Sequence, residues 1–249
     1  MIPILMYHQI GQPAARGTPY RSLIVHPADF RRQMRWLRRL GYTGLSMAQL
    51  MPYLQGRKAG KVVGITFDDG YTNVLQNALP VLLEQGFTAT NYFVAQQLGG
   101  SNVWDHAKGI APSGLMSVED IRVWADAGME VGSHTLDHPD LTTLSPDDAR
   151  RQIDVSRTML ESIAGVPVTA FCYPYGHENM ELRRLVAQAG YTNATTTAGG
   201  LARANDDMFG LPRVVVARST HLLRFLQKCL TSLEDRKRRS LENTQSPRV

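Results

Sequence analysis

Short, mainly apolar runs alternate with amphipathic segments along most of the chain. Residues 2–7, 62–67 and 89–94 form such runs, which are typical of strands buried on both faces of a parallel sheet. Residues 29–40 instead place apolar side chains at the three- to four-residue spacing of a helix. This alternation predicts a parallel sheet covered by helices.

The same pattern continues to residue 230 without a linker or an internal repeat. We expect further strands at residues 129–132, 168–173, 191–196 and 211–217, and helices at residues 46–54, 73–85, 117–128, 145–164, 180–189 and 221–230. Ser117 with Asp120, and Ser145 before Pro146, are typical helix starts, and Gly86 is a typical helix end. We therefore predict one α/β domain over residues 1–230, with its sheet either open or closed into a barrel.

The charge pattern limits the classes of partner. The 249 residues carry a formal charge of +5 and a pI near 9.4. Part of the excess lies in the run Arg236-Lys237-Arg238-Arg239, within a tail, residues 231–249, that we predict to be disordered. We interpret this basic run as a solvated chain end. Peripheral contact with an anionic membrane surface is the alternative interpretation. No basic stripe interleaved with aromatic residues indicates nucleic-acid binding.

Cysteine content and hydropathy bear on the compartment. The only cysteines, Cys172 and Cys229, exclude a disulfide framework. The N-terminal run has no basic segment before it and is short for a signal peptide, and no window has the 18 apolar residues of a membrane span. We expect a cytoplasmic protein; the sequence does not indicate its oligomeric state.

Two adjacent acids follow a predicted buried strand. Asp68 and Asp69 come directly after residues 62–67, where parallel α/β folds gather functional groups. Two carboxylates this close cannot both ionise cheaply unless a cation lies nearby. His8, His134 and His138 also follow predicted strands. We therefore expect these polar groups to meet at one end of the sheet.

The two later histidines suit a metal ion. His134 and His138 are four residues apart, so on one helical turn both imidazoles would face one cation. One aspartate would complete a His-His-Asp set suited to zinc or another divalent transition metal, and the second would serve as general base. Each feature alone has a structural interpretation: a chance histidine spacing, a turn, or a core histidine. Their joint placement favours the metal site.

Three motifs together resemble the polysaccharide deacetylase family, that is, carbohydrate esterase family 4 with its NodB-homology domain. They are Thr66-Phe67-Asp68-Asp69-Gly70-Tyr71, Ser133-His134-Thr135-Leu136-Asp137-His138 and Phe171-Cys172-Tyr173-Pro174-Tyr175-Gly176. The resemblance covers residues 1–217. It implies a distorted (β/α)7 barrel, a divalent metal, and removal of acetyl groups from amino sugars.

The resemblance also implies roles for individual residues. Asp68 would be the general base, and Asp69, His134 and His138 the metal ligands. The metal would be Zn²⁺, with Co²⁺, Ni²⁺ and Mn²⁺ as alternatives. The backbone N–H of Tyr175 would help to stabilise the oxyanion, a role that also suits a fixed turn at a strand end.

Two departures point to a particular branch of the family. Cys172 stands where the third motif usually has an arginine that orients the catalytic aspartate, and we expect Arg213 to supply that guanidinium from another strand. The usual late histidine motif is absent, and His221 lies in a helix-like stretch. Met6-Tyr7-His8 instead resembles the exopolysaccharide (poly-N-acetylglucosamine) deacetylase branch, and we assign His8 as the general acid.

We expect Tyr71, Trp104, Asp105 and Pro174 to contact the sugar, although Trp104 and Asp105 equally suit a loop anchor. The predicted reaction is N-deacetylation of N-acetylglucosamine-type residues in an exopolysaccharide or its lipid-linked precursor, at the inner face of the membrane, in the setting of biofilm or attachment material. An O-acetyl esterase, a deacetylase of a small sugar or glycolipid, and a catalytically silent glycan-binding relative are the alternatives.

Overall fold

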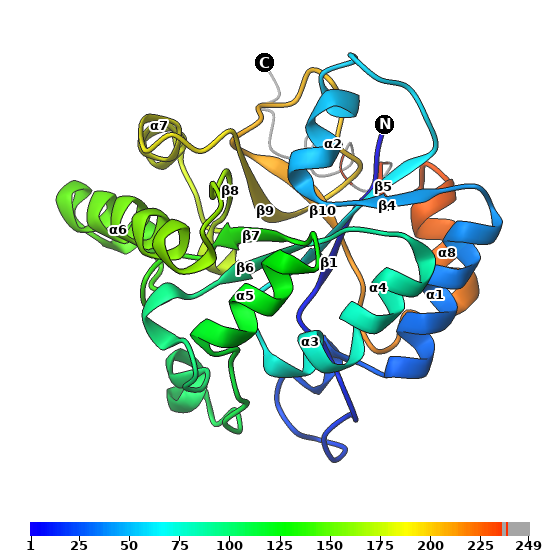
Figure 1. The fold of residues 1–249 in the computed structure, drawn as a ribbon, viewed down its shortest axis with the longest axis horizontal. Coiled ribbons are helices and arrows are strands. Elements are labelled where there is room, and N and C mark those ends of the chain that lie inside the picture. Colours follow the sequence, from blue (N-terminus) through cyan, green and yellow to red (C-terminus); the bar gives the residue numbers. More distant parts are fainter. Residues whose placement is uncertain (236–237, 239–249) are drawn as a thin grey trace, which may run out of the picture.

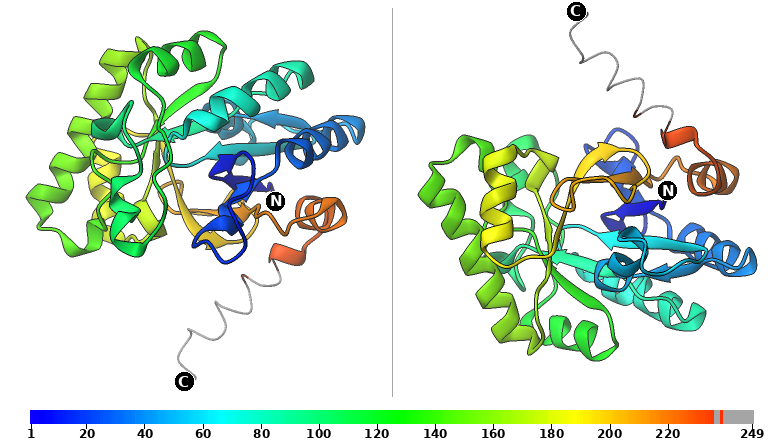
Figure 2. Two further views of the ribbon diagram at one scale, coloured as in Figure 1. Left: turned by 90° about the horizontal axis from the view of Figure 1, so that it is seen from below. Right: turned by 90° about the horizontal axis from the view of Figure 1, so that it is seen from above.

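Seven parallel strands close into a barrel in the computed structural model, which describes residues 1–235 and 238. In order around the barrel they are β1 (Ile4–Tyr7), β5 (Val62–Phe67), β6 (Thr90–Phe93), β7 (Glu130–Ser133), β8 (Ala170–Cys172), β9 (Asn193–Gly199) and β10 (Leu211–Val215). The ring closes because β1 pairs with both β5 and β10. Helices surround the strands (Figures 1 and 2). The predicted (β/α)7 barrel is thereby confirmed.

The register at the closure is set by β1, where Leu5 lies opposite Ile65 on one side and Val214 on the other. Between β9 and β10 the register shifts: Leu211 pairs with Thr195, but Arg213 pairs with Gly199. Such an irregularity bends a strand and re-aims its side chains. The barrel is therefore distorted beside Arg213.

Eight helices cover the barrel in the described part of the chain. They are α1 (Pro27–Arg39), α2 (Met47–Leu54), α3 (Thr72–Asn77), α4 (Leu79–Gln85), α5 (Val118–Asp126), α6 (Pro146–Ala164), α7 (Met180–Gln188) and α8 (Leu222–Leu230). The side chains of Ser46, Ser117 and Ser145 cap α2, α5 and α6, and Ser117 forms a reciprocal capping box with Asp120. These helix starts agree with the prediction.

Two features differ from the sequence prediction. The single helix expected over residues 73–85 is divided into α3 and α4 at Ala78, since Pro80 has no N–H for a continuous helix and is tolerated only in a first turn. Three short strands were not predicted: β2 (Gln9–Ile10), β3 (Ile24–Val25) and β4 (Thr43–Leu45). Segments of two or three residues are too short to show a period.

Apolar side chains are buried in two groups. Ile4, Tyr92, Ala170 and Leu211 belong to a smaller cluster that also contains residues of α2, and Trp124, Phe30 and Phe67 belong to the larger one. Trp124 is fully buried, whereas Trp36 is half-buried beneath the guanidinium of Arg39. Both clusters hold the strands in place, so the side chains at their carboxyl ends are fixed by the barrel.

The folded part of the chain continues past residue 230, where the predicted domain ends. Beyond residue 230, Glu234 and Asp235 are buried, and Arg203 binds Asp235 with a 2.6 Å Nη2–Oδ1 contact. Arg238 likewise binds Asp206. The remainder of the predicted disordered tail, residues 236–237 and 239–249, lies outside the described residues. None of the described helices is long and apolar enough to span a membrane.

Candidate active site

A cavity of about 240 Å³ opens at the carboxyl ends of the strands. Every residue predicted to act in catalysis, sugar binding or metal binding lines this cavity except Pro174 and Arg213; the lining includes His8, Asp68, Asp69, Tyr71, Trp104, Asp105, His134, His138 and Tyr175. Segments from widely separated parts of the sequence therefore meet in one place.

Asp68 is held by a buried arginine. The Arg213 guanidinium donates from Nη1 to Oδ1 at 2.7 Å and from Nη2 to Oδ2 at 2.8 Å. Burial by itself would raise the pKa of Asp68. The charge and hydrogen bonds of Arg213 act in the opposite direction, and the net pKa lies below its usual value. Asp68 is therefore an oriented carboxylate that stays ionised.

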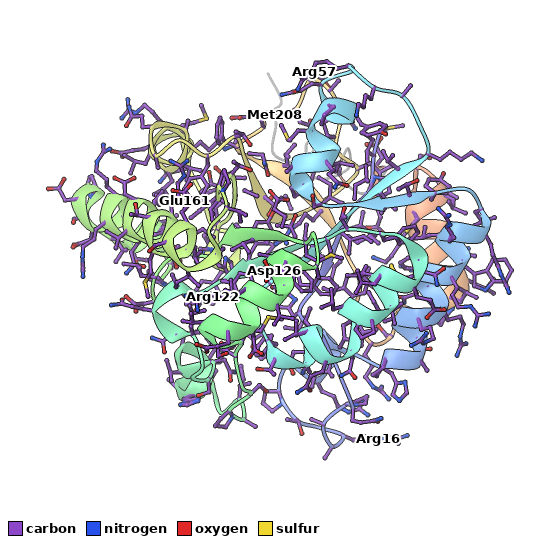
Figure 3. The ribbon with its side chains drawn as sticks, viewed as in Figure 1. Arg16, Arg57, Arg122, Asp126, Glu161 and Met208 are labelled. Carbon is purple, nitrogen blue, oxygen red and sulfur yellow. The ribbon has the colours of Figure 1, made fainter. Side chains whose placement is uncertain are left out.

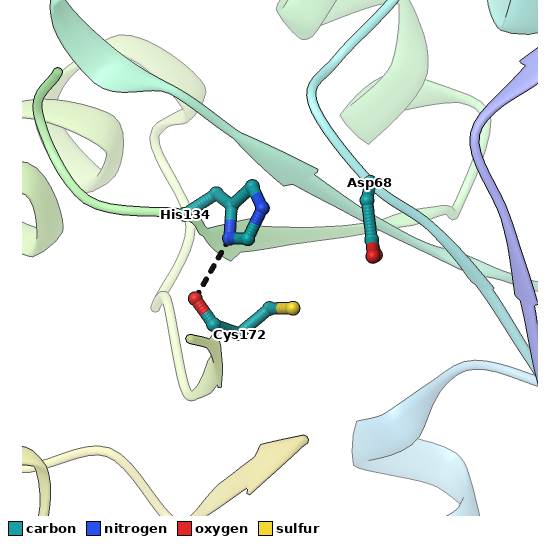
Figure 4. A group of neighbouring side chains, drawn as sticks. All are labelled: Asp68, His134 and Cys172. Carbon is teal, nitrogen blue, oxygen red and sulfur yellow. Dashed lines mark hydrogen bonds between the residues drawn. The ribbon is translucent and has the colours of Figure 1, made fainter. Parts of the chain in front are cut away.

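Cys172 lies between this ion pair and the first histidine. Nη2 of Arg213 is 3.2 Å from the Cys172 sulfur, and the backbone carbonyl of Cys172 accepts a 2.7 Å hydrogen bond from Nδ1 of His134. Figure 4 shows the three side chains of Asp68, His134 and Cys172 around one space. Cys172 thus contacts both the guanidinium that reaches in from β10 and the ring of His134.

Asp69 faces both predicted metal-binding histidines. Its Oδ1 lies 3.4 Å from Nε2 of His134 and 3.5 Å from Nε2 of His138, and all three residues are buried. The three donor atoms lie close enough together to bind one ion. This donor set, one carboxylate and two imidazoles, suits zinc and similar divalent metals.

Hydrogen bonding at His134 supports a cation at this point. A carbonyl oxygen only accepts, so Nδ1 of His134 carries the proton that it donates to Cys172. In the neutral ring Nε2 is then an acceptor, and it faces the Asp69 carboxylate, which also only accepts. A metal ion or a proton between these two acceptors is needed to stabilise them. The residues present therefore fit a bound divalent cation.

The pKa values at the donor set indicate that a proton can take the place of this cation between His134 and Asp69. Burial, reinforced by the charge of His134, lowers the pKa of His138 to about 3, which leaves its ring neutral. Burial opposes charge on His134 too, but Cys172 and Asp69 raise its pKa well above the usual value. Burial also raises the pKa of Asp69, while the two histidines bring it below its usual range. The carboxylate therefore persists as an anion that attracts a cation.

The segment between the histidines is a turn and not the helical turn that we predicted from their spacing. Thr135 has φ 70° and His138 has φ 62°, both in the left-handed region. The Thr135 hydroxyl accepts the backbone N–H of His138 at 3.0 Å and fixes the turn. Asp69 and Tyr175 also have positive φ, of 74° and 59°. Strained backbone of this kind concentrates at functional sites.

Aromatic rings form the walls of the cavity. Trp104 stacks on the His138 ring with centroids 4.7 Å apart, and Tyr175 meets the same ring edge-on at 4.7 Å. Nζ of Lys108 lies 4.4 Å from the Tyr175 ring centroid and 3.1 Å from Oδ1 of Asp105. An apolar face with polar edges of this type suits the ring of a sugar.

The remaining predicted residues lie as follows. Nε2 of His8 is 3.9 Å from Oδ2 of Asp68. Tyr71 is buried, and burial together with the Asp69 carboxylate raises the pKa of its hydroxyl. Pro174 is buried in the turn that presents Tyr175 and does not line the cavity. His221 caps α8 through Nδ1, so it does not belong to this site.

Sequence analysis missed several lining residues. Tyr20, Tyr173 and Thr197 line the cavity, and Lys108 covers the Tyr175 ring. Tyr173 lies in the third motif and in the predicted strand 168–173, but sequence analysis assigned it no role at the site. Tyr20, Lys108 and Thr197 belong to no motif and to no regular apolar pattern. Tyr20 is one of the non-glycine residues with a left-handed backbone, with φ 56°, and this feature is visible only in the structure.

Comparison with known proteins gives consistent matches. A family model described as polysaccharide deacetylase matches residues 55–194. YxkH of Bacillus subtilis, which carries a polysaccharide deacetylase name, is 32% identical over 218 residues, or 87% of this chain and 71% of that protein. The poly-β-1,6-N-acetyl-D-glucosamine N-deacetylase of Escherichia coli K12 is 24% identical over 263 residues; the match covers 92% of this chain but only 38% of that relative.

Solved structures agree with the fold. The Streptococcus pyogenes deacetylase PplD, solved in complex with acetate, superposes with a TM-score of 0.79 at 28% identity, over 92% of this chain and 97% of that one. IcaB from Ammonifex degensii superposes with a TM-score of 0.75 at 24% identity, over 90% of this chain and 94% of that one. The match to IcaB, at this identity, bears on the fold alone.

Proposed function

Because this chain belongs to the polysaccharide deacetylase family, we propose that it is a metal-dependent hydrolase that removes N-acetyl groups from N-acetylglucosamine-type residues of an exopolysaccharide or of its lipid-linked precursor. The observation that carries the proposal is the pairing of two adjacent acids with different partners. Asp68 binds a guanidinium, and Asp69 faces two imidazoles in the same cavity. Such a site holds one acid for proton transfer and one for a metal.

Asp69, His134 and His138 would hold the divalent cation, zinc in our proposal. When bound, this ion polarises a carbonyl and lowers the pKa of water toward about 7. Cobalt, nickel and manganese are the alternative metals for the same donor set, so the assignment to zinc is part of the proposal.

The protein groups supply proton transfer. Asp68 takes the proton from the attacking water, and Arg213 keeps the carboxylate ionised and aimed into the cavity. The amide carbon–nitrogen bond breaks after water adds. His8, with Nε2 3.9 Å from Asp68, would return a proton to the leaving amine. The products are acetate and a free amine on the sugar.

The surroundings would orient the sugar and its acetyl group. The backbone N–H of Tyr175, held by a turn with φ 59°, would donate to the developing oxyanion. Trp104 would stack on a pyranose face, with Tyr71 and Asp105 at the edges of the cavity. Freed amines would add positive charge to the polymer, which suits adhesive surface material.

Acetate release from N-acetylglucosamine oligomers tests the activity. Asp68→Asn keeps the shape of the side chain but removes the base, so we expect at least a 100-fold loss of kcat with added zinc or cobalt. His8→Ala should also lower kcat while the metal content measured by mass spectrometry stays the same. Wild-type protein that binds metal but releases acetate from no sugar would favour a glycan-binding protein.

A matched substrate panel separates the two enzymatic alternatives. O-acetylated xylan oligomers test the esterase activity, and monomeric N-acetylglucosamine and a glycolipid test the small-substrate activity. Higher kcat/KM on N-acetylglucosamine oligomers than on all of these is the expected result. An O-acetyl esterase would use the same base and the same donor set, so the substrate has to distinguish the two reactions. A higher kcat/KM on the acetyl ester would replace the amidase assignment with an esterase assignment.

We also propose a cytoplasmic location at the inner face of the membrane, where a growing lipid-linked glycan would be within reach. The sequence Arg236-Lys237-Arg238-Arg239 supports this through attraction to anionic lipid, although Arg238 also binds Asp206. Cell fractionation that recovers the protein in the exported fraction would overturn this location and leave the chemistry intact.

A further inference from the structure

Three arginines lie on loop segments next to residues that line the cavity. Arg21 begins the short helix Arg21–Leu23, and its neighbours Tyr20 and Leu23 line the cavity. The backbone N–H of Arg218 donates to the carbonyl of Ser22 at 2.8 Å, which fastens the loop after β10 against this segment. Arg16 extends from the same loop region, at the outer edge of this end of the molecule (Figure 3). We call Arg16, Arg21 and Arg218 the rim arginines.

The rim arginines act on one another and have no acidic partner. Partial desolvation, together with the charges of Arg218 and Arg16, lowers the pKa of Arg21. Across residues 1–235 and 238, no carboxylate oxygen lies within 4.0 Å of a nitrogen of these three guanidinium groups. The acid that shares a hollow with Arg218 is Asp29, and Asp29 already contacts Arg32 at 3.4 Å. The cluster therefore carries uncompensated positive charge.

Uncompensated like charges destabilise each other unless an anion binds between them. The planar guanidinium fork matches the oxygens of phosphate and carboxylate groups. Arg218 also lines a neighbouring hollow with Asp29 and Arg32, where those two residues pair with each other and Arg218 keeps its positive charge. A ligand that reaches from the cavity across the rim arginines would thus meet positive charge over several residues.

This charge opposes the product of the proposed reaction. Deacetylation leaves an ammonium group on the sugar, which a positive rim repels. A neutral acetylated glycan gains nothing from the rim, but a glycan that carries anionic substituents gains binding energy. A positive rim of this kind would favour a substrate that carries negative charge.

We propose that the substrate is an acetylated amino-sugar glycan that carries oxyanion groups, either phosphate or uronate carboxylate, and that Arg16, Arg21 and Arg218 bind one such group while the acetylated sugar occupies the cavity. This inference rests on the proposed deacetylase function and narrows its substrate class.

The test compares three N-acetylglucosamine oligomers of equal length: a neutral oligomer, one with a terminal phosphate, and one alternating with glucuronate. The double variant Arg16→Gln/Arg218→Gln removes two exposed rim charges and leaves Arg21, which also binds the Ala14 carbonyl. Arg35→Gln/Arg38→Gln removes the same charge from exposed positions on α1 and is the matched control.

At low salt we expect wild-type kcat/KM to favour one charged oligomer over the neutral one by about three- to tenfold, as for a few exposed ionic contacts. Added NaCl should reduce this preference. The rim variant should lose it through a higher KM with unchanged kcat, because the lost contacts bind substrate and transition state equally. The α1 control should keep it. The charged oligomer that is favoured identifies the oxyanion.

Equal kcat/KM on neutral and charged oligomers, or a preference that survives in the rim variant, would overturn the inference and leave the deacetylase function standing. If no oligomer releases acetate, the proposed function fails, and calorimetric Kd values still decide the inference. Tighter binding of the phosphorylated or glucuronate oligomer by wild type than by the rim variant would support an oxyanion subsite, and equal Kd values would overturn it. A rim variant that loses only binding to phosphatidylglycerol vesicles would assign the rim to lipid and overturn the glycan subsite.

Discussion

Adjacent aspartates at the end of β5 have opposite kinds of partner. Asp68 meets the fixed positive charge of Arg213, and Asp69 meets two imidazole nitrogens. Asp69 itself has a left-handed backbone, with φ 74°. Two chemically identical residues therefore have different electrostatic surroundings, which is why we propose different roles for them.

The ion pair predicts an asymmetric effect on stability. Arg213→Met leaves the buried Asp68 carboxylate without its partner, so we expect the free energy of unfolding to fall by about 3–5 kcal/mol. Adding Asp68→Asn removes the unpaired charge and should recover part of this loss. Urea unfolding measures both variants, and a double variant no more stable than Arg213→Met would contradict the ion-pair explanation.

Glu130 predicts a pH dependence away from the cavity. Its Oε2 accepts the Thr90 hydroxyl at 2.6 Å and the Ala48 N–H at 2.9 Å, and burial raises its pKa above the usual value. The folded protein thus binds this proton more tightly than the unfolded chain does. The resulting stability is fully present below the unfolded pKa, about 4.3, and is lost as pH rises through the folded pKa.

Glu130→Gln mimics the protonated side chain at every pH. We therefore expect the free energy of unfolding of Glu130→Gln, relative to wild type, to increase as pH rises from 4 toward neutrality and then to level off. Urea unfolding at several pH values measures this difference. A difference that stays constant or decreases with pH would show that Glu130 does not titrate in this way.

At the scale of elements, local signals decided where helices begin and end. Ser46, Ser117 and Ser145 cap helices where the sequence predicted, since an N-cap depends on residues only two or three positions away. The turn between His134 and His138 was predicted wrongly as helical. Its left-handed residues are stabilised by contacts beyond the local sequence, including Gln152, whose Oε1 accepts the N–H of Leu136 at 2.9 Å.

Gly86 tests the backbone requirement at a helix end. It ends α4 with φ +65° and has no neighbouring atom within 4 Å of the position of an added Cβ, so Gly86→Ala introduces backbone strain without a clash. We expect a loss of about 1–2 kcal/mol in unfolding free energy. Gly199→Ala is the matched control, because Gly199 also has open space but lacks a left-handed φ. Equal losses in both variants would contradict the strain argument.

At the scale of the whole molecule, closure of the barrel assembles the cavity. The strand order makes β1 a neighbour of both β5 and β10, which brings His8, Asp68 and Arg213 together. β7 then adds His134, and the turn after β8 adds Tyr175. An open sheet would leave the first and last strands at opposite edges.

Metal binding should stabilise this assembly as a unit. A ligand that binds only the folded state adds about 2.7 kcal/mol at a hundredfold excess over its Kd, so zinc should raise the Tm of chelator-treated protein. His138→Ala should lose most of this rise, while His106→Ala, which removes an exposed histidine outside the donor set, should keep it. Equal Tm rises in both variants, measured by calorimetry, would contradict the assigned donor set.

The sequence by itself determined the succession of strands and helices, the caps, and the presence of paired acids and spaced histidines, because periodicity and capping depend on neighbouring residues. The resemblance led us to expect Arg213 beside Asp68, and the tertiary structure shows this contact across 145 positions of sequence. Only the tertiary structure decided that the Cys172 carbonyl fixes the proton on His134 and that the loop at Arg218 packs against the segment at Ser22. These meetings depend on strand register and barrel closure, which couple segments far apart in the chain.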